Sequence, residues 1–128
     1  MENRWRVLLV EDYAIIRDAI RRRLNHFTHD FSVSGEAEDG EVGVTMALAG
    51  TWDIVLLDFS LPKLNGFEVL ERVKAVKPDL PIVMLSSHPA YVFAEVAVAK
   101  GAAHYLEKGD MDLLVQVMRQ VIAQTQSR

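Results

Sequence analysis

Four short apolar segments of this chain each end at polar side chains. The segments are residues 7–10, 54–57, 82–85 and 102–106, and the polar residues that follow them are Glu11, Asp12, Asp58, Ser86, Glu107 and Lys108. Runs this short and this rich in β-branched residues are typical of strands buried on both faces, as in a parallel sheet covered by helices. Several such runs in one chain constrain it to an α/β fold.

The segments between these strands have helical periodicity. Apolar residues recur at three- and four-residue intervals, which predicts helices over about 13–25, 40–50, 67–77, 91–100 and 113–122. Gly50, the Lys77-Pro78 pair and Gly101 end three of them. Residues 30–36 alternate and predict one further strand, the second in the chain.

Five β-α units with right-handed crossovers give a doubly wound five-stranded parallel sheet with helices on both faces. We expect the strand order 2-1-3-4-5 of the flavodoxin-like class, which places the switch point between strands 1 and 3. Asp12 and Asp58 would meet there. The length of 128 residues fits one domain, which we expect over residues 1–124, with 125–128 as a tail or the start of a linker.

Composition excludes some functions. With 18 acidic and 14 basic side chains the formal charge is -4, a poor match for nucleic acid, so direct DNA binding is not expected. The absence of cysteine excludes disulfides and thiolate metal sites and suits a cytoplasmic protein. No apolar run approaches the length of a membrane span, and the charged N-terminus shows no signal peptide, so we expect no membrane partner.

Three carboxylates gathered at one sheet edge need compensation. At about 5 Å and an effective dielectric near 20, each pair repels by roughly 3 kcal/mol. A fold that brings Glu11, Asp12 and Asp58 together must therefore hold a cation, raise a pKa, or both. Oxygen ligands without Cys or His favour a hard ion such as Mg²⁺ (Mg2+). The alternative is that Glu11 and Asp12 only cap the first helix.

Lys108 and Ser86 end neighbouring strands and would face the same edge. The ammonium of Lys108 can pair with a carboxylate or with a phosphoryl oxygen. The alternatives without a function are that Lys108 is a solvated loop lysine and that the Ser86 hydroxyl only ends its strand.

These residues together resemble the receiver domain of two-component response regulators. The resemblance covers essentially the whole chain and includes Glu11-Asp12, the segment 58–66 (DFSLPKLNG), Ser86 and the segment 105–108 (YLEK). The segments 85–88 and 99–108 are most similar to the NarL/FixJ (LuxR-type) subfamily. The resemblance implies a CheY-like (βα)5 fold and a signalling protein that is no enzyme beyond its own phosphorylation and dephosphorylation.

The resemblance also implies roles for individual residues. Asp58 would accept a phosphoryl group from a sensor histidine kinase, Lys108 would contact that group, and Ser86 would hydrogen-bond it once formed. Asp12 and Asp58, with the main-chain carbonyl of Ser60, would hold Mg²⁺, and Glu11 would act through a bound water.

A switch and further partners follow from the same resemblance. Ser86 would move toward the phosphoryl group, the ring of Tyr105 would rotate inward, and the face formed by the fourth helix, fifth strand and fifth helix would change. The output would be transcription, through a DNA-binding domain outside this chain, and a second copy of the chain is a candidate partner.

Three other functions compete with this one. A receiver-like module could signal by partner binding alone, without phosphoryl transfer. An aspartate-nucleophile phosphatase is disfavoured because Ser60 stands where its second acid is expected. A nucleotide-binding protein would need a phosphate-cradling loop such as GxxxxGK, which the sequence lacks.

Overall fold

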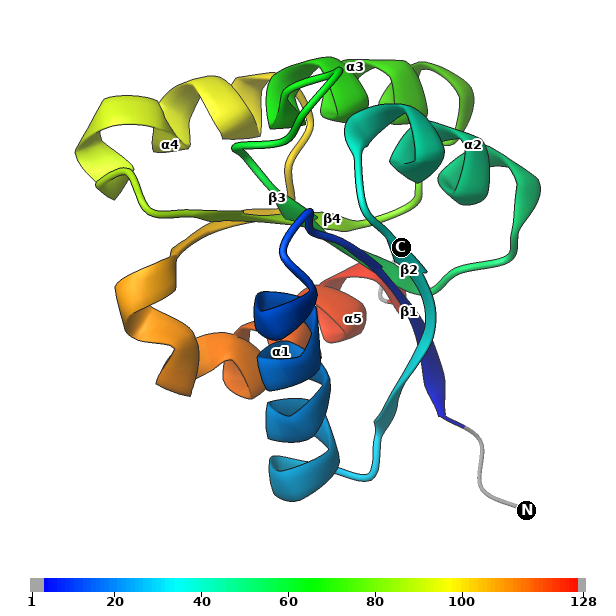
Figure 1. Ribbon diagram of the computed structural model, residues 1–128, viewed down its shortest axis with the longest axis vertical. Coiled ribbons are helices and arrows are strands. Elements are labelled where there is room, and N and C mark those ends of the chain that lie inside the picture. The colour runs from blue at the N-terminus through cyan, green and yellow to red at the C-terminus, as the bar shows by residue number, and fades with distance from the viewer. Residues whose placement is uncertain (1–3, 127–128) are drawn as a thin grey trace.

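The computed structural model describes residues 4–126 and confirms the expected architecture (Figure 1). The five strands are all parallel and lie in the order β2-β1-β3-β4-β5. They are β1 (Trp5–Val10), β2 (Phe31–Ala37), β3 (Ile54–Asp58), β4 (Ile82–Ser86) and β5 (His104–Glu107). The doubly wound, flavodoxin-like sheet is therefore present, with β3 at its centre.

Helices cover both faces of the sheet, with α1 and α5 on one side and α2, α3 and α4 on the other (Figure 1). Their bounds are α1 (Ala14–Phe27), α2 (Gly40–Ala49), α3 (Gly66–Val76), α4 (Ala90–Ala99) and α5 (Leu114–Gln126). A 3₁₀ segment, η1 (Lys108–Leu113), precedes α5 and was not expected from the sequence. The last helix runs on to Gln126, into the expected tail, while residues 127 and 128 lie outside the described residues.

Local chemistry explains where several helices begin and end. The side chain of Asp39 accepts a hydrogen bond from the Val42 amide at the start of α2. Asn65 and Glu68 form a capping box at the start of α3. Gly101 follows α4 with a φ of 111°, the left-handed conformation that a glycine adopts at little cost.

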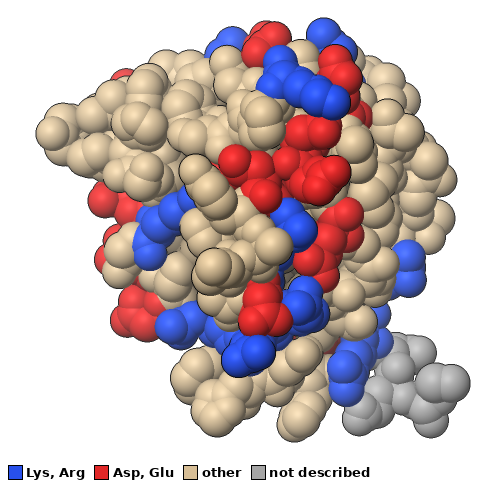
Figure 2. Space-filling view, viewed as in Figure 1, with Lys and Arg blue, Asp and Glu red and all other residues tan. Residues whose placement is uncertain are grey.

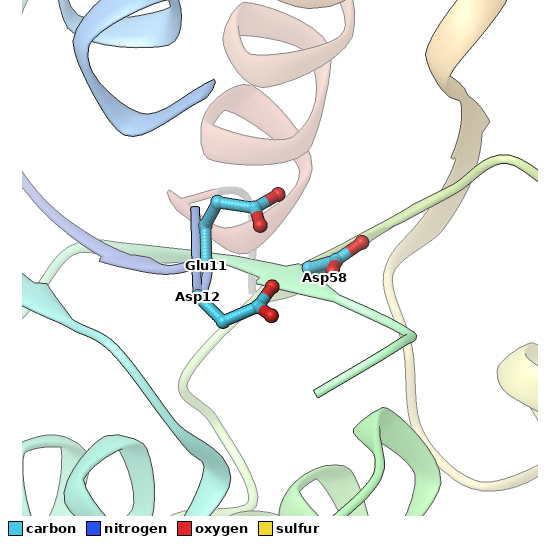
Figure 3. Close-up of side chains that lie close together, drawn as sticks. All are labelled: Glu11, Asp12 and Asp58. Atoms are coloured by element: carbon cyan, nitrogen blue, oxygen red, sulfur yellow. The ribbon is translucent and has the colours of Figure 1, made fainter. Parts of the chain in front are cut away.

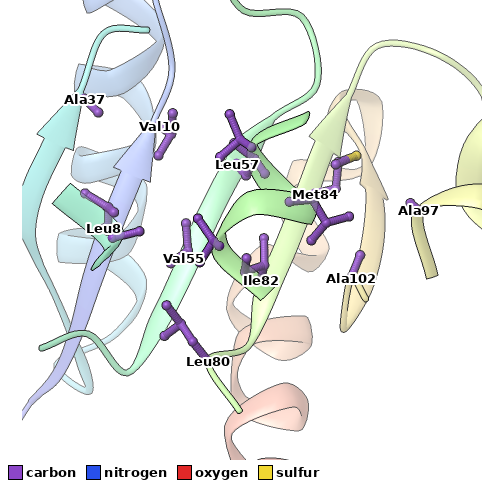
Figure 4. Close-up of a cluster of buried hydrophobic side chains, with 14 of the residues drawn as sticks. Leu8, Val10, Ala37, Val55, Leu57, Leu80, Ile82, Met84, Ala97 and Ala102 are labelled. Atoms are coloured by element: carbon purple, nitrogen blue, oxygen red, sulfur yellow. The ribbon is translucent and has the colours of Figure 1, made fainter. Parts of the chain in front are cut away.

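Alternation along the strands builds two hydrophobic cores. In β1, Leu8 and Val10 face the α2–α3–α4 side, while Val7 and Leu9 face the α1–α5 side. Figure 4 shows part of the first core, where side chains from β1, β3 and β4 meet those of Ala97 and Ala102. Burial on both faces stabilises the fold by about 1.5–3 kcal/mol for each large side chain and fixes the strands that carry the polar ends.

Register then sets which polar residues meet. Val10 pairs with Leu57, so Glu11 leaves β1 at the level of Asp58, the last residue of β3. Gly66 allows α3 to start close to this point, because a Cβ there would lie 2.7 Å from the Cα of Phe59. No helix among residues 4–126 is long and apolar enough to span a membrane.

Candidate functional site

The predicted acidic cluster is present at the carboxyl edge of the sheet. Glu11, Asp12 and Asp58 each offer one carboxylate oxygen, and these three atoms lie within 4.8 Å of one another. Figure 3 shows the three side chains projecting beyond the ends of β1 and β3, and Figure 2 shows acidic side chains gathered near the middle of this face. Glu11 and Asp58 are 0% and 2% exposed, so these two carboxylates of the cluster are buried and not on the solvated surface.

Lys108 reaches back from η1 into the cluster. Its Nζ lies 2.8 Å from Oδ1 of Asp58 and donates a 3.2 Å hydrogen bond to Oε1 of Glu11. The other carboxylate oxygen of Glu11 accepts a hydrogen bond from the Tyr13 amide at 3.1 Å. Lys108 is thus no solvated loop lysine, and its single positive charge contacts two of the three carboxylates of the cluster.

The electrostatics show that this compensation is incomplete. Burial raises the pKa of Asp58, and the hydrogen bond and charge of Lys108 only partly oppose it. Burial likewise raises the pKa of Glu11, against the Tyr13 amide. Burial would lower the pKa of Lys108, but its contacts with Asp58 and Glu11 raise it, so the ammonium stays charged.

The residues fit a bound Mg²⁺. Oδ1 of Asp12 is buried and has no hydrogen-bond partner within the described residues, which leaves an acceptor aimed into the cluster without a donor. The donor set consists only of oxygen atoms, the ligands that Mg²⁺ prefers. Glu11 and Asp12 do more than cap the first helix: the N-cap of α1 is Tyr13, whose amide Glu11 accepts from, and both acids also belong to the carboxylate cluster.

Ser86 and Tyr105 are joined through one residue, His88. The Ser86 hydroxyl accepts a 3.0 Å hydrogen bond from the His88 amide and lies 3.3 Å from its Nδ1. The Tyr105 hydroxyl donates to the His88 carbonyl at 2.9 Å. The Tyr105 ring is already buried here, so the anticipated inward rotation would need a different starting conformation; the switch roles of Ser86 and Tyr105 and the ligand role of Ser60 stay predictions.

Two supporting residues were missed in the sequence. The spacing of Arg17 gives it no role, but its guanidinium donates to the main-chain carbonyls of Glu11 and Asp12. Glu107 accepts a hydrogen bond from the Ala90 amide and so caps α4, whose own N-cap, Pro89, makes no side-chain cap. The available signal for Glu107 was that α4 begins after Pro89, whose side chain cannot accept a hydrogen bond from the first amides of the helix.

The α4 surface is more exposed than simple core packing requires. Tyr91 is 90% exposed, Val92, Val96 and Val98 are also exposed, and Ala97 is the fully buried residue of the helix. Most of the large apolar side chains of this helix are therefore not covered by the rest of the domain.

The three acids and Lys108 lie at the carboxyl edge of a doubly wound sheet, which is where open α/β sheets place their functional sites. The sequence model of the response regulator receiver domain matches residues 7–119, and the chain belongs to this family. The fold is therefore CheY-like, and the chain is part of a two-component signalling protein.

Two curated relatives share this domain. The chain is 30% identical over 124 residues to the transcriptional regulatory protein DegU of Brevibacillus brevis, covering 96% of the chain and 52% of that protein. It is 37% identical over 103 residues to the response regulator UvrY of Escherichia coli O6:H1, covering 80% and 47%. The chain thus spans about half the length of these relatives.

Solved structures agree with the fold. A LuxR-family two-component response regulator from Aurantimonas sp. SI85-9A1 superposes with a TM-score of 0.88 at 29% identity, covering 94% of this chain and 86% of that one. The response regulator domain of Thermotoga maritima CheB gives 0.83 at 25%, covering 94% and 98%. Together with DegU and UvrY, the LuxR-family match supports the NarL/FixJ subfamily.

Proposed function

We propose that Asp58 accepts a phosphoryl group from the phosphohistidine of a sensor histidine kinase, in the presence of Mg²⁺. The observation that carries the proposal is the buried acidic cluster, in which an oxygen of Asp12 has no donor among residues 4–126 and Lys108 contacts Asp58 at 2.8 Å. Asp12, Asp58 and the main-chain carbonyl of Ser60 would hold the ion, and Glu11 would hold one of its waters.

The transfer is a displacement at phosphorus. A carboxylate oxygen of Asp58 forms the new O–P bond, the N–P bond of the phosphohistidine breaks, and its electron pair returns to the imidazole. Phosphoryl transfer depends on positioning and charge neutralisation more than on covalent help. Mg²⁺ would supply two positive charges to the phosphoryl oxygens, and Lys108, 2.8 Å from Asp58, would supply one more.

The response would begin at Ser86. A phosphoryl group brings about -1.5 to -2 charges and three acceptor oxygens. To donate to one of them, Ser86 would move toward Asp58 and so pull on its contacts with His88, whose carbonyl also accepts from the Tyr105 hydroxyl. The loop into α4 would then shift and change the α4–β5–α5 face, where Tyr91 is already exposed.

The output belongs to the same proposal. DegU is named a transcriptional regulatory protein and is about twice as long as the matched region, which supports control of transcription through a DNA-binding domain beyond this chain. The proposal also includes a cytoplasmic location, because the kinase's ATP and the DNA target would both be in the cytoplasm. It includes a second copy of the chain as a partner, because two-fold symmetric dimers are the commonest oligomers.

Intact mass spectrometry after incubation with acetyl phosphate and Mg²⁺ tests this function. We expect the wild-type chain to gain one phosphoryl mass, and Asp58→Asn or chelation of Mg²⁺ to abolish the gain. Asp110→Asn, an exposed aspartate outside the cluster, should gain mass as the wild type does. No gain in the wild type would favour signalling by partner binding alone.

A further inference from the structure

We propose that Arg17 is a positioning residue that fixes the main chain carrying Glu11 and Asp12 and thereby sets the affinity of the cluster for Mg²⁺. This inference rests on the proposed function, since it concerns the ion used there. It gives a role to a side chain that touches neither the ion nor the phosphoryl group.

The guanidinium of Arg17 donates hydrogen bonds to the loop between β1 and α1. Its Nη1 donates to the carbonyl of Glu11 at 2.7 Å and to the carbonyl of Asp12 at 3.2 Å. The side chain is 17% exposed, whereas that of Arg22 on the same helix is 79% exposed. The Arg17 guanidinium is therefore largely removed from solvent and makes two hydrogen bonds to the main chain of Glu11 and Asp12.

The second of these contacts acts on a peptide that also holds Glu11. The carbonyl of Asp12 and the amide of Tyr13 belong to one peptide group, and that amide donates to Oε2 of Glu11 at 3.1 Å. A charged donor on the carbonyl strengthens the hydrogen bond made by the amide, because bonds in a chain polarise one another. Arg17 thus orients the Glu11 carboxylate through the backbone, without touching it.

Arg17 is itself held in place from β2. Its Nε donates to Oε1 of Glu36 at 3.1 Å, and Arg21 pairs with the other oxygen of Glu36. The loop needs such an anchor, since Glu11 is the last residue tied to β2 by its amide, through a 3.0 Å bond to Ala37. Beyond that bond, the carboxylates of Glu11 and Asp12 repel each other. Among the described residues, Arg17 is the one side chain that donates hydrogen bonds to the main-chain carbonyls of this pair.

Calorimetric titration of the unphosphorylated chain with Mg²⁺ tests this role. Residues that orient metal ligands typically contribute 10–100-fold to affinity, so Arg17→Ala should weaken Mg²⁺ binding about tenfold. Arg17→Lys should recover part of the loss, because an ammonium replaces the planar fork with a point charge. Arg21→Ala is the matched control: it removes contacts with Glu36 and Asp18 but none with the loop, and its Mg²⁺ affinity should equal that of the wild type.

The rate of phosphorylation by acetyl phosphate separates positioning from simple loss of structure. For Arg17→Ala we expect a slow rate at low Mg²⁺ that recovers at saturating Mg²⁺. Mg²⁺ affinity equal to the wild type in Arg17→Ala, or an equal loss in Arg21→Ala, would overturn the inference. If circular dichroism shows Arg17→Ala unfolded, folded Arg17→Lys with wild-type affinity would overturn it as well.

The same data distinguish the two proposals. A wild-type chain that binds Mg²⁺ tenfold more tightly than Arg17→Ala, yet gains no phosphoryl mass, supports the role of Arg17 and refutes phosphoryl acceptance. A wild-type chain that binds no Mg²⁺ refutes both.

Discussion

Replacing Lys108 by Met should destabilise the protein strongly in the absence of Mg²⁺. Methionine keeps the apolar stem but removes the ammonium that lies 2.8 Å from Asp58 and 3.2 Å from Glu11. Both carboxylates are almost fully buried, so neither can recover its lost partner from solvent. The variant therefore leaves two buried, mutually repelling charges without a cation.

The magnitude follows from these distances. At an effective dielectric near 20, the two attractions are worth about 6 and 5 kcal/mol before the cost of desolvating the ammonium is subtracted. Removing one partner of a buried ion pair typically costs about 3–5 kcal/mol, and the Lys108 side chain is a quarter exposed, which favours about 3 kcal/mol. Against a total stability of about 5–15 kcal/mol, such a loss is easily measured.

The loss should depend on pH with a defined sign. Burial raises the pKa of Asp58 and Glu11 above their ordinary values of 3.8 and 4.5, so the folded state binds more protons and gains stability as pH falls through the raised values. Lys108 opposes both increases, and its removal raises the two pKa values further. The deficit of Lys108→Met should therefore be largest near neutral pH and shrink in mild acid.

In the wild type, the contribution of Lys108 to stability changes with pH in the alkaline range. The pKa of Lys108 is raised above 10.5 by Asp58 and Glu11 despite burial, so its contribution to stability is complete below that value. The contribution is lost as pH rises through the raised value.

Urea unfolding in the presence of a chelator, at neutral and mildly acidic pH, measures these effects. Lys100→Met is the control, because Lys100 lies 3.3 Å from Glu71, a half-exposed partner, and such a pair is worth about 0.2–1 kcal/mol. The reasoning is refuted if Lys108→Met loses no more stability than Lys100→Met, or if its deficit grows in acid.

Three further substitutions test other parts of the site. Asp12→Asn should raise the free energy of unfolding by about 1 kcal/mol in chelator, because one repelling charge is removed, and should abolish stabilisation by Mg²⁺ in thermal melts. Tyr105→Phe should cost about 1 kcal/mol in urea unfolding, since it removes the hydrogen bond to the His88 carbonyl; an unchanged midpoint would contradict that bond. Gly66→Ala should cost about 2 kcal/mol or more and slow phosphorylation by acetyl phosphate, because its Cβ would meet the Phe59 backbone at 2.7 Å; wild-type stability would show that the loop can yield.

The sequence predicted the fold and the acidic site because both depend on local patterns. Buried β-branched runs identify strands, and the carboxyl ends of parallel strands meet at one edge, which brought Asp12, Asp58 and Lys108 together before any coordinates were known. The strand order came from the fold class, since periodicity does not carry it.

The supporting contacts escaped because periodicity reports the side of a helix and not the reach of a side chain. Arg17 occupies a polar position of α1, yet helical side chains lean toward the N-terminus, and this one is long enough to return to the Asp12 carbonyl. The bond from Tyr105 to His88 depends on the conformation of a loop that no pattern describes. The last helix outran its apolar periodicity because Ala123 and Gln124 are tolerated in helices without any buried face.

The proposed phosphoryl acceptor, Asp58, lies where the main chain is held firmly in place. Asp58 ends the central strand, and the next residue, Phe59, is tied on both sides, by its amide to Leu85 and by its carbonyl to the amide of Gly66. Because Phe59 is held in this way, we expect the proposed response to be taken up at the end of the neighbouring strand β4, where the Ser86 hydroxyl accepts a hydrogen bond from the His88 amide. Substitutions on these two segments can therefore alter sensitivity and response independently.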